Sequence, residues 1–168
     1  MKRLLIASNN EGKIKEIREV FSGLDYEIIS MKDMGLDLTI IEDQPDFSGN
    51  SFKKASEVSK QAGEIVLADD SGLGNKPGVR SARFAGEYAT DEENNEKLLS
   101  LLKHIPAERR RARFRCVLTM YWPNGFYFQT EGTCHGKIGF TPAGSEGFGY
   151  DPLFILEGFQ KTMAQLTI

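Results

Sequence analysis

The chain has 168 residues, of which 40% are hydrophobic and 27% are charged. This length and composition are typical of one globular domain with its own core, and they exclude collagen, a disordered tail and a disulfide-stapled miniprotein. The net charge of −3 argues against broad electrostatic binding of nucleic acid or of an anionic membrane surface.

The first half of the chain alternates strands and helices. A short apolar run predicts a strand at Arg3 to Ser8. After Lys13 the apolar residues recur every three or four positions, which predicts a helix that ends near Gly23. The further elements predicted here are a strand at Tyr26 to Ile29, an irregular acidic segment at Asp33 to Asp46, a helix at Ser48 to Ala62 and a strand at Ile65 to Ala68. This order is typical of an α/β fold.

The second half has a different pattern. Thr90 and Glu93 have the spacing of a capping box, which predicts a helix that ends near His104. Apolar and polar residues then alternate, as in strands, on both sides of a turn signal at Asn124-Gly125. The predicted strands are Ala112 to Tyr121, Phe126 to Glu131 and Thr133 to Phe140, and a loop with Gly144, Gly147 and Gly149 follows them. The sequence therefore predicts one α/β domain with a mixed sheet.

The sequence contains no sign of export or of a membrane anchor. No apolar run approaches the roughly 18 residues of a membrane span. The apolar stretch at the N-terminus is too short for a secretory signal. Cys116 and Cys134 are the two cysteines of the chain. We therefore expect a cytoplasmic protein whose cysteines are reduced thiols.

A polar segment between the first predicted strand and helix is the first candidate site. The segment from Ser8 to Lys13 reads S-N-N-E-G-K and differs from a P-loop at both of its ends. The N–H groups at a helix N-terminus nevertheless bind anions well, and Lys13 adds a full positive charge. The alternative is an ordinary helix start that is capped by asparagine and carries an exposed lysine.

Two adjacent carboxylates, Asp69 and Asp70, follow the predicted strand at Ile65 to Ala68. Ligands of α/β sheets gather at the carboxyl ends of strands, where carboxylates suit a divalent metal ion or a general base. Successive side chains on a strand point opposite ways, so one carboxylate would face the site and the other could cap backbone groups. The alternative is an Asx turn that closes the strand.

Glu42, Asn50 and Lys54 form a weaker candidate set. Glu42 lies in the acidic segment, and a spacing of four places Asn50 and Lys54 on one face of the next helix. The three side chains could bind a metal-bound phosphate. A solvated helix face explains them equally well.

The segment from Gly147 to Pro152 places two aromatic residues between glycines. Phe148 and Tyr150 could offer a flat stacking surface beside backbone donors, which would suit a planar heterocycle. In the alternative interpretation both aromatic side chains pack into the core.

Five arginines lie between Arg109 and Arg115. Nucleic acid is one possible ligand, and an RNA-binding module stays an alternative for the whole chain. Because the chain is acidic overall, a solvated strand face or a subunit contact is the favoured interpretation. His104 and His135 have no Cys or His at metal-ligand spacing, which argues against a zinc site.

In combination these segments resemble the inosine triphosphate pyrophosphatase (ITPase) family, whose members hydrolyse non-standard purine nucleoside triphosphates. The motifs in chain order are S-N-N-E-G-K, E-x-x-x-x-F-x-x-N-x-x-x-K-A, A-D-D-S-G-L, P-G-V-x-S-A-R-F-A-G, R-x-A-R-F-x-C-V-L and G-F-G-Y-D-P-L-F. They extend over Leu4 to Leu166. The resemblance implies a single domain over residues 1–168, with an elongated mixed β-sheet, flanking helices, two lobes around a central cleft, and a homodimer.

The resemblance also implies a reaction. Water would attack between the α- and β-phosphates of ITP, dITP or XTP in a Mg²⁺-dependent step that gives the monophosphate and pyrophosphate. Asp70 and Lys13 would be catalytic, and Glu42 and Asp70 would bind the metal ion. The substrate would be bound by Ser8, Asn9, Asn10, Lys13, Lys54, Ser71, Phe148, Gly149, Tyr150 and Asp151.

The chain departs from the usual family pattern at three places. Around the metal carboxylate, the departures are Gln44, Asp46, Gly49 and Ser51. The segment from Gly74 to Lys76 is shorter than in the family, and the family's terminal Ser-His-Arg motif is absent before the last residue, Ile168. We expect weaker base selectivity and a changed cleft or dimer contact. The alternative to an active enzyme is a nucleotide-binding or interaction protein of the same fold with little or no turnover.

Overall fold

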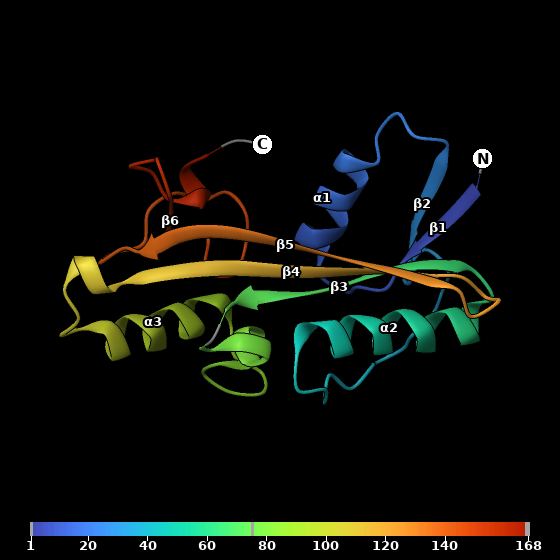
Figure 1. Cartoon of the computed structure of the whole chain (residues 1–168), viewed down its shortest axis with the longest axis horizontal. Coiled ribbons are helices and arrows are strands. Elements are labelled where there is room, and N and C mark those ends of the chain that lie inside the picture. Colours follow the sequence, from blue (N-terminus) through green and yellow to red (C-terminus); the bar gives the residue numbers. More distant parts are fainter. Residues whose placement is uncertain (1, 75, 167–168) are drawn as a thin grey trace. The chain divides into compact units, whose positions relative to one another are not determined.

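The computed structural model describes residues 2–74 and 76–166, and within these ranges six strands form one mixed sheet (Figure 1). The hydrogen-bonded strand order is β2-β1-β3-β4-β5-β6. The elements are β1 (Lys2–Ile6), α1 (Glu11–Val20), β2 (Tyr26–Ser30), α2 (Phe47–Ala62), β3 (Ile65–Leu73), α3 (Asp91–Leu102), β4 (Arg111–Tyr121), β5 (Tyr127–Ile138) and β6 (Phe154–Leu156), with 3₁₀-helices at Gly78–Arg83, Ala107–Arg109 and Met163–Gln165. The mixed α/β class predicted from the sequence is confirmed.

The chain divides into two compact units. Unit 1 contains the chain up to Asp70 together with Cys116–Glu131, and unit 2 contains Ser71–Arg115 together with the chain from Gly132 onward. The chain passes from one unit to the other inside β3, β4 and β5. Each unit has its own hydrophobic core.

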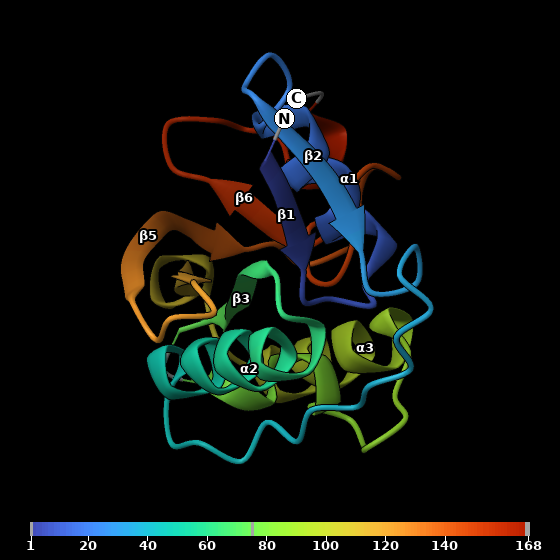
Figure 2. The ribbon, with the colours of Figure 1, turned by 90° about the vertical axis from the view of Figure 1, so that its right-hand side faces the viewer.

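The core of unit 1 lies on both faces of parallel strands. β1 pairs in parallel with β2 and with β3. Leu5 and Val66 pack with Val58 of α2, whereas Leu4 and its neighbours pack with Ile14 of α1. Figures 1 and 2 show α1 and α2 on different sides of these strands. This double cover explains why the paired parts of β1 and β3, Leu4 to Ile6 and Ile65 to Leu67, are apolar on both faces.

The helices of unit 1 begin and end at residues suited to their places. The side chain of Asn10 accepts a hydrogen bond from the N–H of Lys13 and caps α1, and the side chain of Asp46 caps α2 in the same way. α2 ends at Gly63, whose positive φ of 68° favours glycine. None of the helices in the described ranges combines the length and apolar character needed to cross a membrane.

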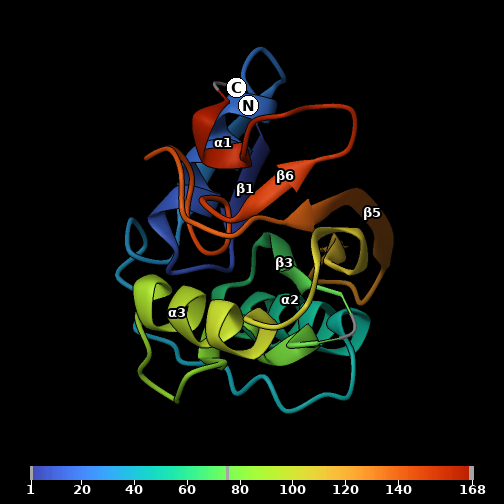
Figure 3. The same ribbon diagram turned by 90° about the vertical axis from the view of Figure 1, so that its left-hand side faces the viewer.

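The core of unit 2 joins α3 to the last strands. Leu98 of α3 packs with Leu153 and Phe154, and the ring of Phe154 lies 4.5 Å from that of Phe114. β6 pairs antiparallel with the end of β5. Gly136 is required there, because a Cβ atom at this position would lie 2.3 Å from the carbonyl oxygen of Ile155. Figures 1 and 3 show β6 as the edge strand next to β5, and α3 on the side of β4 and β5 away from it.

Two strand predictions were wrong in their extent. The segment from Asp69 to Gly72 continues β3 and does not form the Asx turn that closes the strand. The two strands predicted at Phe126 to Glu131 and Thr133 to Phe140 are one strand, β5. Gly132, which separated them in the prediction, weakens a strand without ending it when a neighbouring strand supplies hydrogen bonds.

Candidate functional site

The loop between β1 and α1 is a capped helix start at the carboxyl end of β1. Asn10 accepts the N–H of Lys13 at 3.2 Å, and the hydroxyl of Ser8 accepts the N–H of Asn10 at 3.1 Å. Asn9 and Asn10 are exposed. The capping interpretation is therefore correct for Asn10. Because Asn10 caps only the N–H of Lys13, the other N–H groups of the first turn have no partner inside the helix, and such groups can bind an anion.

Lys13 is not the exposed lysine of that alternative. Its Nζ lies 2.5 Å from Oδ2 of Asp69, and the two side chains are only 18% and 6% exposed. Burial by itself would lower the pKa of Lys13, but the charge of Asp69 and its hydrogen bond outweigh burial and raise that pKa above its usual 10.5. Lys13 therefore stays cationic at every physiological pH.

Asp70 is buried beside a second lysine–carboxylate pair. Its Oδ2 accepts a hydrogen bond from Nδ2 of Asn50 at 2.9 Å, and Nζ of Lys54 lies 2.7 Å from Oε1 of Glu42. Burial and then the negative charge of Glu42 raise the pKa of Asp70 to about 6, although Lys54, Asn50 and Lys13 act in the opposite direction. Glu42, Lys54, Asn50 and Asp70 thus form one electrostatic group.

The two carboxylates of β3 belong to opposite faces of the strand. Asp69 pairs with Lys13 of α1, and Asp70 is bonded to Asn50 of α2. This division follows from the two-residue period of a strand, and it confirms that the two side chains point opposite ways. That Asp69 caps backbone groups stays a prediction, and the contact that the structure shows for it is the one with the ammonium of Lys13.

Asn50 connects the acidic segment to Asp70. It is fully buried, and its side chain accepts the N–H of Gln44 at 2.9 Å while it donates to Asp70. The residues that depart from the family pattern fit this arrangement. Asp46 caps α2, and the hydroxyl of Ser51 donates to the carbonyl oxygen of Ala68. The residues that differ from the family pattern therefore still hold α2 and β3 around Asp70, the candidate metal carboxylate.

Glu42 and Asp70 are the carboxylates that suit a metal ion. Within residues 2–74 and 76–166 no three His, Cys, Asp or Glu side chains gather as a complete metal site. Mg²⁺ is commonly bound through one or two carboxylates and the phosphates of a substrate. A cation would also offset the repulsion by which Glu42 raises the pKa of Asp70. The donor set fits a divalent ion that is shared with a phosphate ligand.

Cys116 was not predicted as a neighbour of the Lys13–Asp69 pair. Burial and the charge of Asp69 raise the pKa of its thiol to about 11, with Lys13 acting in the opposite direction. The thiol is therefore protonated at neutral pH. The alternation of β4 could have placed it, because Leu118 and Met120 at the same period pack on the α1 side of unit 1.

The remaining sequence-predicted site residues lie in unit 2. Phe148 is half-buried, and its N–H donates to Oδ2 of Asp151 at 3.0 Å. Tyr150 is only 4% exposed, packs in the core, and donates its hydroxyl to the carbonyl oxygen of Ser81 at 2.6 Å. For Tyr150, core packing is therefore the better interpretation. Ser71 is half-buried in β3.

The sequence-predicted site residues consequently divide between the units. Unit 1 brings together the lysines, the candidate metal carboxylates and the capped loop at Ser8 to Lys13. Unit 2 contains Ser71 and the Phe148–Asp151 segment.

The interpretation of the arginine cluster as a solvated face was wrong for Arg110. This side chain is buried, and its guanidinium donates to the carbonyl oxygens of Leu102, Ile105 and Gly139. It also lies 3.8 Å from the centre of the Phe140 ring. Arg110 thus satisfies carbonyl groups at the end of α3, where a cation is also favoured by the helix dipole.

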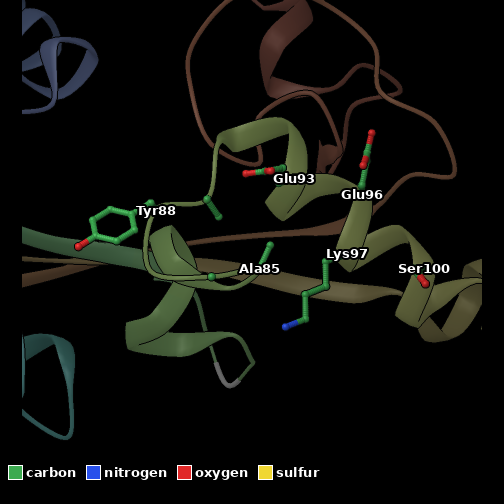
Figure 4. Close-up of a pocket in the computed structure, with 8 residues that line it drawn as sticks. Ala85, Tyr88, Glu93, Glu96, Lys97 and Ser100 are labelled. Atoms are coloured by element: carbon green, nitrogen blue, oxygen red, sulfur yellow. The ribbon is translucent and has the colours of Figure 1, made fainter.

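A cavity of about 560 Å³ lies along the outer face of α3 in unit 2 (Figure 4). Its lining includes Tyr88, Glu93, Glu96 and Lys97. Glu93 caps the helix, and Lys97 donates to the carbonyl oxygen of Phe84, so both side chains already have structural partners. Among the described residues, those that line this cavity do not include a sequence-predicted site residue.

Known proteins resemble the chain over nearly its whole length. The Ham1 family model matches residues 4–168. A dITP/XTP pyrophosphatase of Clostridium perfringens is 43% identical over 99% of this chain and 87% of its own length, and one of Bacillus subtilis is 44% identical with the same coverage. The Ham1 protein of Staphylococcus aureus, a solved structure, is 40% identical with a TM-score of 0.84 over 99% of this chain and 87% of its own. The chain belongs to the Ham1 family.

Proposed function

We propose that this protein hydrolyses non-standard purine nucleoside triphosphates such as ITP, dITP and XTP to the monophosphate and pyrophosphate. Relatives named dITP/XTP pyrophosphatase match 99% of the chain at 43% and 44% identity, which supports this activity. The observation that carries the proposal is the group in unit 1 that combines buried Asp70 with the Glu42–Lys54 pair. Carboxylates and a lysine in one buried group suit a metal-bound polyphosphate.

The cationic side of the proposed site is Lys13 with the N-terminus of α1. The triphosphate carries about four negative charges near neutral pH. Backbone N–H groups of the first turn and the ammonium of Lys13 would bind these charges, and Ser8, Asn9 and Asn10 would contribute polar contacts. Asp69 holds the ammonium of Lys13 in place at 2.5 Å.

Mg²⁺ is the proposed cofactor, and Glu42 and Asp70 would hold it. When bound, it would neutralise phosphate charge and polarise a phosphoryl oxygen. Asp70, with a pKa of about 6, is mostly ionised at neutral pH and can bind a metal ion or take a proton from the attacking water. Asn50 keeps the Asp70 carboxylate in one orientation through its hydrogen bond, and Lys54 adds positive charge beside Glu42.

The proposed base site is in unit 2. Phe148 would stack on the purine, with Gly149 and Asp151 beside it and Ser71 as a further substrate contact. Tyr150 is buried, so it would anchor the Phe148–Asp151 segment in the core and would not stack on the purine.

We also propose that the protein is a cytoplasmic homodimer without a nucleic acid or membrane partner. The exposed aromatic side chains Phe126, Tyr127 and Phe128 in the β4–β5 hairpin are suited to cover by a second copy. The net charge of −3 supports the absence of nucleic acid.

The test is a panel of purine nucleoside triphosphates with detection of pyrophosphate, with Mg²⁺ and with a chelator. We expect release from ITP, dITP and XTP that exceeds release from ATP and that stops when the metal is chelated. If calorimetry shows that ITP binds but no pyrophosphate forms, the alternative of a nucleotide-binding protein without turnover is correct. If no triphosphate of the panel is hydrolysed or bound, the proposal is wrong altogether.

Replacement of Phe148 by alanine is expected to weaken base binding. Stacking of an aromatic side chain on a base contributes about 1–3 kcal/mol, so KM for ITP should rise about tenfold or more. The matched control is Tyr150→Phe, which removes only a buried hydroxyl bonded to Ser81 and should lower stability with little change in KM. Steady-state kinetics of both variants check the prediction, and an unchanged KM in Phe148→Ala would contradict it.

A further inference from the structure

The first turns of α3 hold the backbone of the Phe148–Asp151 segment. The N–H of Gly149 donates to Oδ2 of Asp91 at 2.7 Å. The carbonyl oxygen of Gly149 accepts from Nδ2 of Asn95 at 3.0 Å. Both hydrogen-bonding groups of a single loop residue are therefore taken up by side chains of one helix. Two such bonds on one residue fix the peptide planes on both sides of it.

The helix that provides these two side chains is itself well anchored. Asp91 and Asn95 are four residues apart, so they lie on one face of α3. α3 starts with a complete capping box, in which the side chain of Thr90 accepts the N–H of Glu93 and the side chain of Glu93 accepts the N–H of Thr90. Asn95 is 7% exposed and so has little freedom to move.

The loop adds its own constraints around Phe148. Gly147 has a φ of +75°, and a Cβ atom there would lie 2.1 Å from Oδ2 of Asp151, so this position requires glycine. The same Asp151 oxygen accepts the N–H of Phe148. Asp151 therefore holds Phe148 from one side, and Asp91 and Asn95 hold the next residue from the other. Phe148 itself remains half-buried.

We propose that Asp91 and Asn95 are positioning residues for base recognition, because they fix the Gly149 backbone and thereby the direction of the Phe148 ring. This inference rests on the proposed function, in which Phe148 stacks on the purine. The two residues touch the loop and not the phosphates, so they act on affinity for the base. Their loss would leave Phe148 present but free to adopt several orientations, and the substrate would have to order it on binding.

Asn94 provides a matched control on the same helix. It is buried to a similar extent, and it also makes two bonds to loop backbone. Its Oδ1 accepts from the N–H of Ala85, and its Nδ2 donates to the carbonyl oxygen of Ala82. Asn94→Ala therefore removes the same kind of contacts from a different loop.

The experiment compares Asp91→Ala, Asn95→Ala and Asn94→Ala with the unchanged protein. For each we would measure kcat and KM for ITP and the inhibition constant of inorganic pyrophosphate. We expect KM to rise about five- to thirtyfold in the first two variants, the range expected for loss of one hydrogen bond, with little change in kcat. The pyrophosphate inhibition constant should stay within about twofold, because the phosphate site in unit 1 is untouched. Asp91→Asn keeps an acceptor oxygen and should restore KM to within about threefold of the unchanged protein.

Several outcomes would overturn the inference. KM could be unchanged in Asp91→Ala and Asn95→Ala, Asn94→Ala could raise KM equally, or the pyrophosphate inhibition constant could rise in parallel with KM. If Asn95→Ala does not fold, Asp91→Ala and Asp91→Asn still test the inference, because Asp91 is exposed. Failure of the proposed function is distinguishable, because the unchanged protein would then neither bind nor hydrolyse ITP in the same assays, and there would be no base to position.

Discussion

Asp70→Asn is expected to remove pyrophosphate release while it makes the metal-free protein more stable at neutral pH. The lost carboxylate is the proposed general base or metal ligand, and loss of such a group typically lowers kcat by about a hundredfold to ten-thousandfold. The stabilisation arises because burial and the charge of Glu42 disfavour the ionised form of Asp70, which asparagine does not have. Asparagine can still accept the hydrogen bond that Asn50 donates.

The sign of the pH dependence follows from the raised pKa. Between 3.8, the usual value, and about 6, the folded protein keeps a proton on Asp70 that the unfolded chain has lost. Stability therefore falls as the pH rises through this window, and above it the folded state of the unchanged protein carries a cost of about 3 kcal/mol. The advantage of Asp70→Asn should be absent below about pH 4 and complete above about pH 7.

Urea unfolding in the presence of a chelator, at about pH 4.5 and about pH 7.5, measures this difference. Asp37→Asn is the control, since it makes the same chemical change at an exposed position. Added Mg²⁺ should stabilise the unchanged protein more than Asp70→Asn, because binding to the folded state raises stability. Equal stability of Asp70→Asn and the unchanged protein at the higher pH would contradict the prediction, as would an unchanged kcat.

The local signals of the sequence were enough for most of the fold. The capping box at Thr90 places the start of α3, and Gly63 places the end of α2, because both depend on contacts within a few residues. The extent of β3 and β5 could not be predicted in the same way. Residues such as Asp69 and Gly132 have low strand propensity, and it is the neighbouring strand that keeps them extended.

The candidate site shows the same limit. The spacing of Asn50 and Lys54 correctly placed them on one face of α2, but it could not show that Asn50 reaches Asp70 or that Lys54 reaches Glu42. Those contacts depend on the path of the irregular segment before α2. Asp91 and Asn95 were missed because polar residues at the start of a helix are usually solvated. A signal was present, because the spacing of Asp91 and Asn95 places both on the face of α3 that also carries the buried Leu98.

The second large effect is expected at Lys13. Lys13→Met keeps the apolar stem but leaves Asp69, whose side chain is 6% exposed, without its ammonium partner. Removal of one member of a buried ion pair typically costs roughly 3–5 kcal/mol. The pKa of Lys13 in the folded protein is raised above 10.5. The ion pair therefore contributes its full stabilisation wherever Asp69 is ionised and the pH is below 10.5. This stabilisation is lost only as the pH rises through the pKa that Lys13 has in the folded protein. The effect should therefore be the same at about pH 7 and about pH 9.

The double variant Lys13→Met with Asp69→Asn separates the cost of an unpaired charge from the loss of phosphate binding. In thermal unfolding, Lys13→Met alone should lower Tm by roughly 10 °C. The double variant should recover much of this loss, because it leaves no uncompensated charge. Hydrolysis of ITP should not recover, because the positive charge proposed to bind the triphosphate is missing from both variants. Recovery of stability without activity assigns both roles to Lys13. Parallel recovery of both would mean that Lys13 affects hydrolysis only by keeping unit 1 folded, and a double variant no more stable than Lys13→Met would show that the pair with Asp69 contributes little.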